Sequence, residues 1–347
     1  MNNILSRSQN CINNIIFHAN RYADGLIKAD GRKTCTELSK ALDVGHDKIQ
    51  RDLENTSKHL DEVRALLVSN VINKKRQGFL ISDSTLLIKE YSHKIEGVSH
   101  QHDGSKDQII PGIGLSAIVW TDFESIEPVD LFMWQKGDRS KIATSTDKVI
   151  ALAQKTNALG VLADAAFASI EALVKYAQAN VSYIMRFHAN RVVTVPGFVG
   201  AAPIKNHPAF KLTRNRRCII RMVIWHDIKL RVIALKFKNK NGDWTHMFLV
   251  TNMSRYDTQQ IAKLYKYRWK IETFFRTCKQ KFGLGDCQAR SIKKQEAHCL
   301  NVFLAYSKYM GNKRTSENQS INRLARKKDP MLLDQKGLQI GSLGSYA

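Results

Sequence analysis

The sequence predicts an α/β protein with a mixed sheet, an N-terminal helical region and a β-rich segment ahead of a long helix. Two observations predict this class. Between residues 76 and 190, apolar runs and helical patterns follow the order three strands, helix, strand, helix, strand, which is typical of a sheet with helices packed on it. Residues 191–252 instead consist of strand-like runs separated by turn signals such as Asn241-Gly242-Asp243.

Residues 1–75 are expected to be helical, with helical patterns over residues 15–23, 36–42 and 48–67. Thr34 and Glu37 have the spacing of a capping box at the start of the second helix. Gly45 then offers a positive φ in the turn that follows. This layout predicts a helix-turn-helix with Lys48 and Arg51 toward DNA, although a plain pair of helices explains it equally well.

In the segment that follows, residues 78–85 are predicted to form a buried strand that carries Asp83. We expect a solvated loop around His100, His102 and Asp103 rather than a metal site, because nothing nearby completes a ligand set. Residues 111–121 and 125–134 are expected to pair antiparallel beside the first strand. A helix over residues 145–157, a short strand ending at Asp164, a helix capped by Ser169 and a strand over residues 181–187 complete the alternation.

The chain from Lys263 to Lys281 is predicted to be one amphipathic helix, because its apolar residues recur at helical spacing without Pro or Gly. Tyr265, Arg268, Glu272 and Lys279 fall within an arc of about 60° beside the apolar stripe. Glu272 is the only acid in this window. Two interpretations remain open: a core helix with an Arg268–Glu272 pair, or a metal ligand held against a phosphate backbone. A further helix over residues 295–310 and disorder from Gly311 are expected.

The charge balance points to a polyanionic partner. The chain has 347 residues, with 54 Lys and Arg against 31 Asp and Glu, and a formal net charge of +23. Nucleic acid is the first candidate for such a chain, although ribosomal and membrane-surface proteins can carry the same excess. The six cysteines form no C-x-x-C pair, so we expect reduced thiols. Without a signal peptide or an apolar span in the sequence, a cytoplasmic protein is expected.

Three acids are candidates for chemistry. Asp83 and Asp164 end predicted strands, and Glu272 lies on the basic helix. Three carboxylates without Cys or His partners suit Mg²⁺ or Mn²⁺ rather than Zn²⁺. Two such ions would clamp the attacking and leaving oxygens of a phosphodiester. The alternative is that each strand-end Asp is only a turn or cap residue.

Tyr265, Arg268, Glu272 and Lys279 match Y-x2-R-x3-E-x6-K without a gap. This pattern resembles the signature of a large group of bacterial insertion-sequence transposases of the DDE type. Residues 78–84 look like that group's first-Asp strand, and residues 249–252 look like the strand ahead of its third acid. Residues 94–106 are similar to a segment after the first Asp in some subgroups. The resemblance covers roughly residues 60 to 305.

The resemblance implies an RNase H-like core with a β-rich insertion between the second and third acids. It also implies that Asp83, Asp164 and Glu272 bind two Mg²⁺, and that Tyr265, Arg268 and Lys279 hold the phosphates of the transposon end. The implied partners are double-stranded DNA, both end repeats and target, and a second copy in a dimeric synaptic complex near the nucleoid. The expected domains are 1–75 (helical, DNA-binding), 76–190 (first part of the core), 191–252 (insertion), 253–310 (catalytic helix and C-terminal helices) and 311–347 (disordered tail).

One departure from the pattern concerns the second acid. In the group this Asp is commonly followed by Arg-Gly and an aromatic residue, whereas Asp164 is followed by Ala165-Ala166-Phe167. The departure motivates an alternative to an active transposase, a catalytically impaired or repurposed DNA-binding protein. A structure-selective nuclease on the same fold is a further alternative. Trp225 or Trp244 could stack a flipped base in the resembled reaction, but each is expected to be a core residue.

Overall fold

The computed structural model describes residues 2–92, 94–103, 107–135, 137–213, 215–239 and 241–327. Its strands are β1 (Phe79–Ile88), β2 (Ser99–Asp103), β3 (Gln108–Thr121), β4 (Ile126–Trp134), β5 (Gly160–Ala163), β6 (Tyr183–Phe187), β7 (Val192–Thr194), β8 (Ala201–Pro203), β9 (Cys218–Trp225), β10 (Ile228–Lys238) and β11 (Trp244–Thr251). Its α-helices are α1 (Asn2–Lys28), α2 (Cys35–Leu42), α3 (His46–Lys58), α4 (Leu60–Ile72), α5 (Lys141–Thr156), α6 (Ile170–Gln178), α7 (Thr258–Lys266), α8 (Lys270–Phe282) and α9 (Ile292–Lys327). Short 3₁₀ turns are η1 (Ala165–Phe167), η2 (Pro208–Phe210) and η3 (Tyr267–Trp269).

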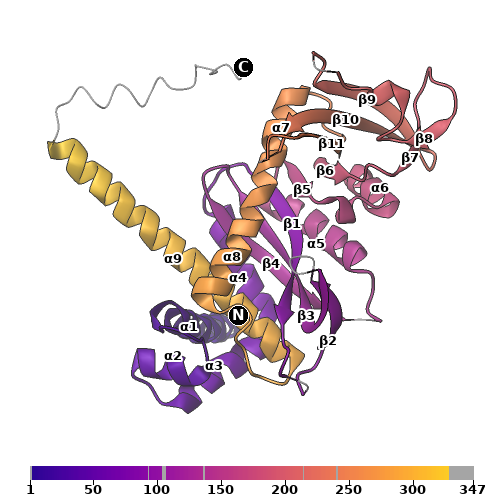
Figure 1. The fold of residues 1–347 in the computed structure, drawn as a ribbon. Coiled ribbons are helices and arrows are strands. Elements are labelled where there is room, and N and C mark those ends of the chain that lie inside the picture. Colours follow the sequence, from indigo (N-terminus) through magenta and orange to yellow (C-terminus); the bar gives the residue numbers. More distant parts are fainter. Residues whose placement is uncertain are drawn as a thin grey trace.

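The strands of the described residues form one 11-stranded mixed sheet in the order β2-β3-β1-β5-β6-β11-β10-β9-β7-β8, with β4 paired to β3 (Figure 1). Strands β1, β5 and β6 are parallel neighbours, whereas β3 runs antiparallel to β1 and β4 runs antiparallel to β3. Strand β11 pairs antiparallel with β6. The β-rich segment therefore extends the same sheet instead of forming a separate one.

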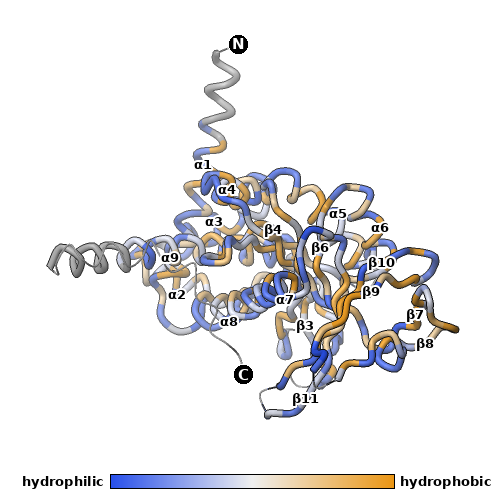
Figure 2. Tube along the Cα trace, turned by 90° about the horizontal axis from the view of Figure 1, so that it is seen from above, coloured by the Kyte–Doolittle hydropathy of each residue, from blue (hydrophilic) through white to orange (hydrophobic). Residues whose placement is uncertain are grey.

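The sheet is covered on both faces. On one face Phe79 and Ile81 of β1 belong to a core shared with Phe274 of α8. On the other face Leu80 belongs to a second core shared with α5 and α6, which includes Leu173. This two-sided burial explains why β1 reads as a continuous apolar run rather than an alternating one. Figure 2 shows the hydrophobic strands lying between α7 and α8 on one side and α5 and α6 on the other.

The N-terminal helices share their core with the C-terminal helix α9. Arg64 of α4 donates to Asp130 of β4 at 3.0 Å and pairs with Glu296 of α9 at 2.5 Å. Lys308 of α9 pairs with Asp24 of α1 at 2.5 Å. Because these contacts join α1 and α4 to α9, the helices of residues 1–75 pack as part of one body with the sheet. The division into the domains expected above stays a prediction.

His298 of α9 links three parts of this core and makes its stability depend on pH. The buried imidazole lies 3.0 Å from the hydroxyl of Tyr22, and its Nε2 donates to the carbonyl of Gly283 at 2.9 Å. Burial lowers the pKa of His298 to about 4. The unfolded chain binds this proton near pH 6.5, so stability is complete above that pH and is lost as the pH falls toward 4.

We expect the free energy of unfolding to drop by up to about 3 kcal/mol between pH 7 and pH 4 through His298 alone. Urea unfolding at several pH values measures this. The variant His298→Gln should be less stable at pH 7 but should show a flatter pH dependence. The exposed His46 serves as control, because His46→Gln should keep the wild-type slope. An unchanged slope in His298→Gln would contradict the prediction.

Most of the predicted alternation is confirmed. The antiparallel pair of residues 111–121 and 125–134 is present as β3 and β4, and β3 lies beside β1. The hydroxyl of Ser169 caps α6 by accepting from the Ala172 amide at 3.1 Å. At α2 the Thr34 hydroxyl accepts from the Glu37 amide at 3.3 Å, whereas the Glu37 carboxylate pairs with Lys40. Among the described residues, no helix is both long and apolar enough to cross a membrane.

Two predicted helices are each divided. Residues 263–281 form α7, η3 and α8 instead of one regular helix. Apolar periodicity does not reveal a single tighter turn, because side chains three and four residues apart both stay on the same side. Residues 48–67 are broken at His59 into α3 and α4. Both halves contact α1 and α9, and α4 in addition packs on β4 and α5.

Three local expectations also differ from the structure. Asp43, with φ of 53°, takes the left-handed position in the α2–α3 turn, whereas Gly45 has φ of −62°; Asp tolerates this region through its short polar side chain. The segment of His100 and His102 is not a loop but strand β2, because the edge of β3 offers it backbone partners. Disorder was expected from Gly311, yet α9 continues to Lys327; residues 328–347 of the expected tail lie outside the described residues.

Candidate active site

Strands β1 and β5 bring Asp83 and Asp164 to the same level of the sheet. Their parallel register runs from Phe79 opposite Gly160 to Ser82 opposite Ala163. Asp83 and Asp164 are the next residues in step, and the backbone of Asp164 is still extended, with φ of −78° and ψ of 172°. Side chains alternate along a strand, so both acids fall on the face of Ile81 and Leu162, which is the face that α8 covers.

Helix α8 brings Glu272 to the same place through Arg268. The guanidinium of Arg268 donates from Nη1 to Asp83 Oδ2 at 3.0 Å and from Nη2 to Glu272 Oε1 at 2.7 Å. The predicted Arg268–Glu272 pair is therefore present, and Asp83 joins it from 185 positions away in the sequence. Figure 1 shows α8 lying across β1, which is the arrangement that allows this bridge.

The electrostatics of Asp83 show that the three acids act on one another. Burial is the main reason why the pKa of Asp83 lies above its ordinary value, and the charges of Asp164 and Glu272 raise it further. The Ser84 amide, which donates to Asp83 Oδ1 at 2.8 Å, and the Arg268 guanidinium oppose this shift. A partly buried place that gathers three carboxylates is a place where a cation is stabilised.

The donor chemistry of these acids fits a hard divalent cation, since all the ligand atoms are carboxylate oxygens. The described residues nevertheless contain no group of three or more His, Cys, Asp or Glu already arranged to hold a metal ion. The guanidinium of Arg268 lies between Asp83 and Glu272 and pairs with both.

The other residues of the Y-x2-R-x3-E-x6-K pattern occupy two different surroundings. Tyr265 is buried close to Arg268 and Asp164, and burial raises its pKa to about 12. Lys279 lies farther along α8, where Asp103 of β2 is its nearest opposing charge, and loss of hydration lowers its pKa. Tyr265 thus lies with the acid cluster, whereas Lys279 lies apart from it, near Asp103.

Lys48 and Arg51 lie on α3, remote from the acids in the sequence, and both side chains are exposed. The helix itself is held by its opposite side, where the fully buried Asp52 accepts from Arg21 of α1 at 2.6 Å and contacts His18 at 2.6 Å. This anchoring presents the two cations to solvent on a rigid element. Whether they contact DNA stays a prediction.

Two residues near the acids were missed by the sequence analysis. Lys141, the first residue of α5, donates to Ser84 Oγ at 3.1 Å and is close enough to Asp83 for its charge to matter. Arg186 on β6 faces solvent near Tyr265. No local signal marks either residue, because their place beside the acids follows from strand pairing. Of the two tryptophans expected in the core, Trp225 is buried but Trp244 is 43% exposed.

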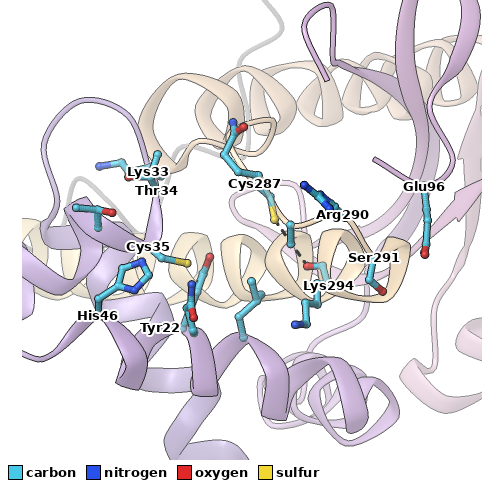
Figure 3. A pocket seen from close by; sticks show the side chains of 15 residues that line it. Tyr22, Lys33, Thr34, Cys35, His46, Glu96, Cys287, Arg290, Ser291 and Lys294 are labelled. Carbon is cyan, nitrogen blue, oxygen red and sulfur yellow. Dashed lines mark hydrogen bonds between the residues drawn. The ribbon is translucent and has the colours of Figure 1, made fainter. Parts of the chain in front are cut away.

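A cavity of about 750 Å³ lies elsewhere, between the N-terminal helices and the segment that joins α8 to α9 (Figure 3). None of the predicted site residues lines it. Three of its charged groups are used within the protein: Lys33 donates to the Ala29 carbonyl, Lys294 pairs with Glu54 at 2.6 Å, and Glu96 accepts from the first amide of α9. The acids of the sheet are therefore the better candidate for chemistry.

Comparison with known proteins identifies a family for this chain. Residues 75–308 match the family described as transposase DDE domain. A piggyBac transposase, solved as a synaptic complex with hairpin DNA, is similar at 12% identity and a TM-score of 0.46, over 86% of this chain and 66% of that one. The NurA nuclease from Sulfolobus solfataricus is similar at 11% identity and a TM-score of 0.28, over 79% of this chain and 98% of that one. No curated protein matches the sequence. Because the domain match spans most of the chain and includes Asp83, Asp164 and Glu272, this protein belongs to the transposase DDE domain family.

Proposed function

We propose that this protein is a DNA transposase of the insertion-sequence type, which cleaves transposon ends and joins them to target DNA. The observation that carries the proposal is the bridge of Arg268 between Asp83 and Glu272, beside Asp164. It supports a site in which three oxygen-donor acids act beside a guanidinium that could bind phosphate, in a chain with net charge +23. Cleavage of a polyanion needs this combination of a cation site and fixed positive charge.

We further propose an RNase H-like core formed by β4, β3, β1, β5 and β6, with β7 to β11 as the insertion between the second and third acids. The order of these strands and the antiparallel direction of β3 support this reading. In this frame residues 76–190 and 253–310 carry the chemistry, residues 1–75 bind DNA, and residues 191–252 are the insertion. Double-stranded DNA, both end repeats and target, would be the substrate, and a homodimer would hold two ends together in the bacterial cytoplasm.

Asp83, Asp164 and Glu272 would hold Mg²⁺ or Mn²⁺, in the two-ion arrangement that the resemblance implies. When bound, such ions activate water as a nucleophile and stabilise the leaving oxygen. The role of the protein's other residues would be to position the DNA phosphates. Arg268, once released from the two carboxylates, is placed to donate to a phosphate oxygen. Tyr265 fixes the direction of Arg268 from the buried side, and Lys279 attracts the phosphates that flank the cut.

The test is incubation of the full chain with Mg²⁺ and a labelled duplex taken from the DNA that flanks the gene. Cleavage followed by joining of the new 3′-OH to a second duplex supports the transposase. A mobility shift without cleavage would indicate a repurposed DNA-binding protein. Cutting of any branched duplex without joining would indicate a structure-selective nuclease. Either of these last two results would overturn the proposal that the protein is a transposase.

Helix α3 provides a separate prediction about DNA binding. If Lys48 and Arg51 each neutralise one phosphate, replacing either by Ala should make the dependence of log K on log [salt] shallower by about 0.9. Fluorescence anisotropy at salt concentrations from roughly 50 to 300 mM measures the slope, because phosphate contacts are lost over about this range. Lys155→Ala, an exposed lysine on α5, is the matched control. Unchanged slopes for Lys48→Ala and Arg51→Ala would remove α3 from the DNA interface.

A further inference from the structure

Lys141 is a partly buried cation without an acid partner. Its ammonium donates to Ser84 Oγ at 3.1 Å and lies 5.1 Å from the ring centre of Trp134 and 5.8 Å from that of Phe167. Among the ion pairs of the described residues, none involves Lys141, whereas Lys148 on the same helix pairs with Asp130 at 2.7 Å. An ammonium group has three donors, so two of those of Lys141 remain available to a ligand.

The position of Lys141 follows from the unequal lengths of β1 and β5. Strand β5 pairs with β1 only as far as Ser82, whereas β1 continues to Ile88. Beyond Ser82 the edge of β1 on this side is therefore not covered by β5. Lys141 contacts β1 there, at Ser84, from the face opposite to that of Asp83. The acids thus have Arg268 on the α8 side and Lys141 on the α5 side.

The chemistry of this position favours a phosphate. Burial lowers the pKa of Lys141, and Asp83 is the acid whose charge opposes the shift. A desolvated ammonium with unused donors is stabilised when an anion pairs with it. The segment directly after Asp164, Ala165-Ala166-Phe167, carries no cation. Lys141, which lies over the ring of Phe167, brings a positive charge to this side of the site from another element.

We propose that Lys141 binds a non-bridging oxygen of the DNA phosphate held at Asp83 and Asp164, and that it supplies the positive charge which the segment after Asp164 lacks. This inference rests on the proposed function, since it assumes that DNA is the substrate of the acid site. It assigns a substrate-binding role to a residue of α5.

The test uses Lys141→Met, Lys141→Arg and the control Lys155→Met, which removes the same charge at the other end of α5 from an exposed position. Two quantities are measured on the flanking-DNA duplex: the single-turnover cleavage rate in Mg²⁺, and the salt dependence of affinity with Ca²⁺ in place of Mg²⁺. For Lys141→Met we expect a slope shallower by about 0.9, the value for one lost phosphate contact. We also expect a rate lower by about 100-fold, as for loss of one electrostatic contact. Lys141→Arg should recover most of both, and Lys155→Met should match the wild type.

The outcomes separate this inference from the proposed function. If the wild type cleaves and Lys141→Met equals Lys155→Met, Lys141 has no phosphate role although the protein is a transposase. If the wild type does not cleave but Lys141→Met still has the shallower slope, the phosphate contact stands and the transposase proposal fails. A slower rate with an unchanged slope and weaker Mn²⁺ binding would show that Lys141 only positions Asp83, which overturns the inference. Melting temperatures identify any variant that fails to fold.

Discussion

Replacing Asp83 by Asn, Asp164 by Asn or Glu272 by Gln should each lower metal-dependent cleavage by at least about 1,000-fold, because each change removes an anionic ligand from a site whose chemistry is electrostatic. DNA affinity should change little, since the basic surface is untouched. Single-turnover cleavage and anisotropy with the flanking-DNA duplex measure the two effects. Glu171→Gln, at an exposed acid on α6, controls for the change of net charge.

The variant Asp83→Asn should not destabilise the fold at neutral pH. The pKa of Asp83 is raised in the folded protein, so its charged form costs free energy on folding, and stability from this group increases as the pH falls. Asparagine keeps an oxygen that can accept from the Ser84 amide. We therefore expect Asp83→Asn to melt, in EDTA, at or above the wild-type temperature. An inactive variant that melts well below wild type would mean that Asp83 is a structural residue.

Arg268→Ala should separate metal binding from catalysis. The guanidinium neutralises Asp83 and Glu272 in the metal-free protein, so its removal leaves two carboxylates without their partner and lowers the melting temperature in EDTA. The same removal eliminates the cation that a metal ion must displace. We expect Mn²⁺ to bind at least about tenfold more tightly, equivalent to about 1.4 kcal/mol. The melting temperature should therefore rise more steeply with Mn²⁺ than in the wild type.

Cleavage by Arg268→Ala should fall by about 100-fold or more despite the tighter metal binding, because the phosphate loses its guanidinium contact. Calorimetric titration with Mn²⁺, thermal melts and single-turnover cleavage measure the three effects on one protein preparation. Arg276→Ala, an exposed arginine two turns later on α8, is the matched control and should leave all three unchanged. Weaker Mn²⁺ binding in Arg268→Ala would show that the guanidinium organises the acids instead of competing for them.

The order of strands and helices was predictable because it depends on short-range patterns. The apolar run of β1, the capping hydroxyl of Ser169 and the strand-like texture of residues 191–252 are properties of neighbouring residues. Breaks such as His59 and the η3 turn were not predictable, because the apolar spacing of a helix continues across a single irregular turn. Strand β2 was missed for a related reason: its polar sequence pairs only because β3 provides an open edge.

By itself, the sequence determined the types of chemistry available to this protein: a strongly basic chain, acids at two strand ends, and Arg268 and Glu272 one helical turn apart. These features depend on composition and on spacings of a few residues. Only the tertiary structure decided that Arg268 bridges Asp83 and Glu272, and that Lys141 stands on the other side of the same strand. Such contacts depend on strand register and helix packing, which are set by the burial of the whole sheet and not by any local pattern.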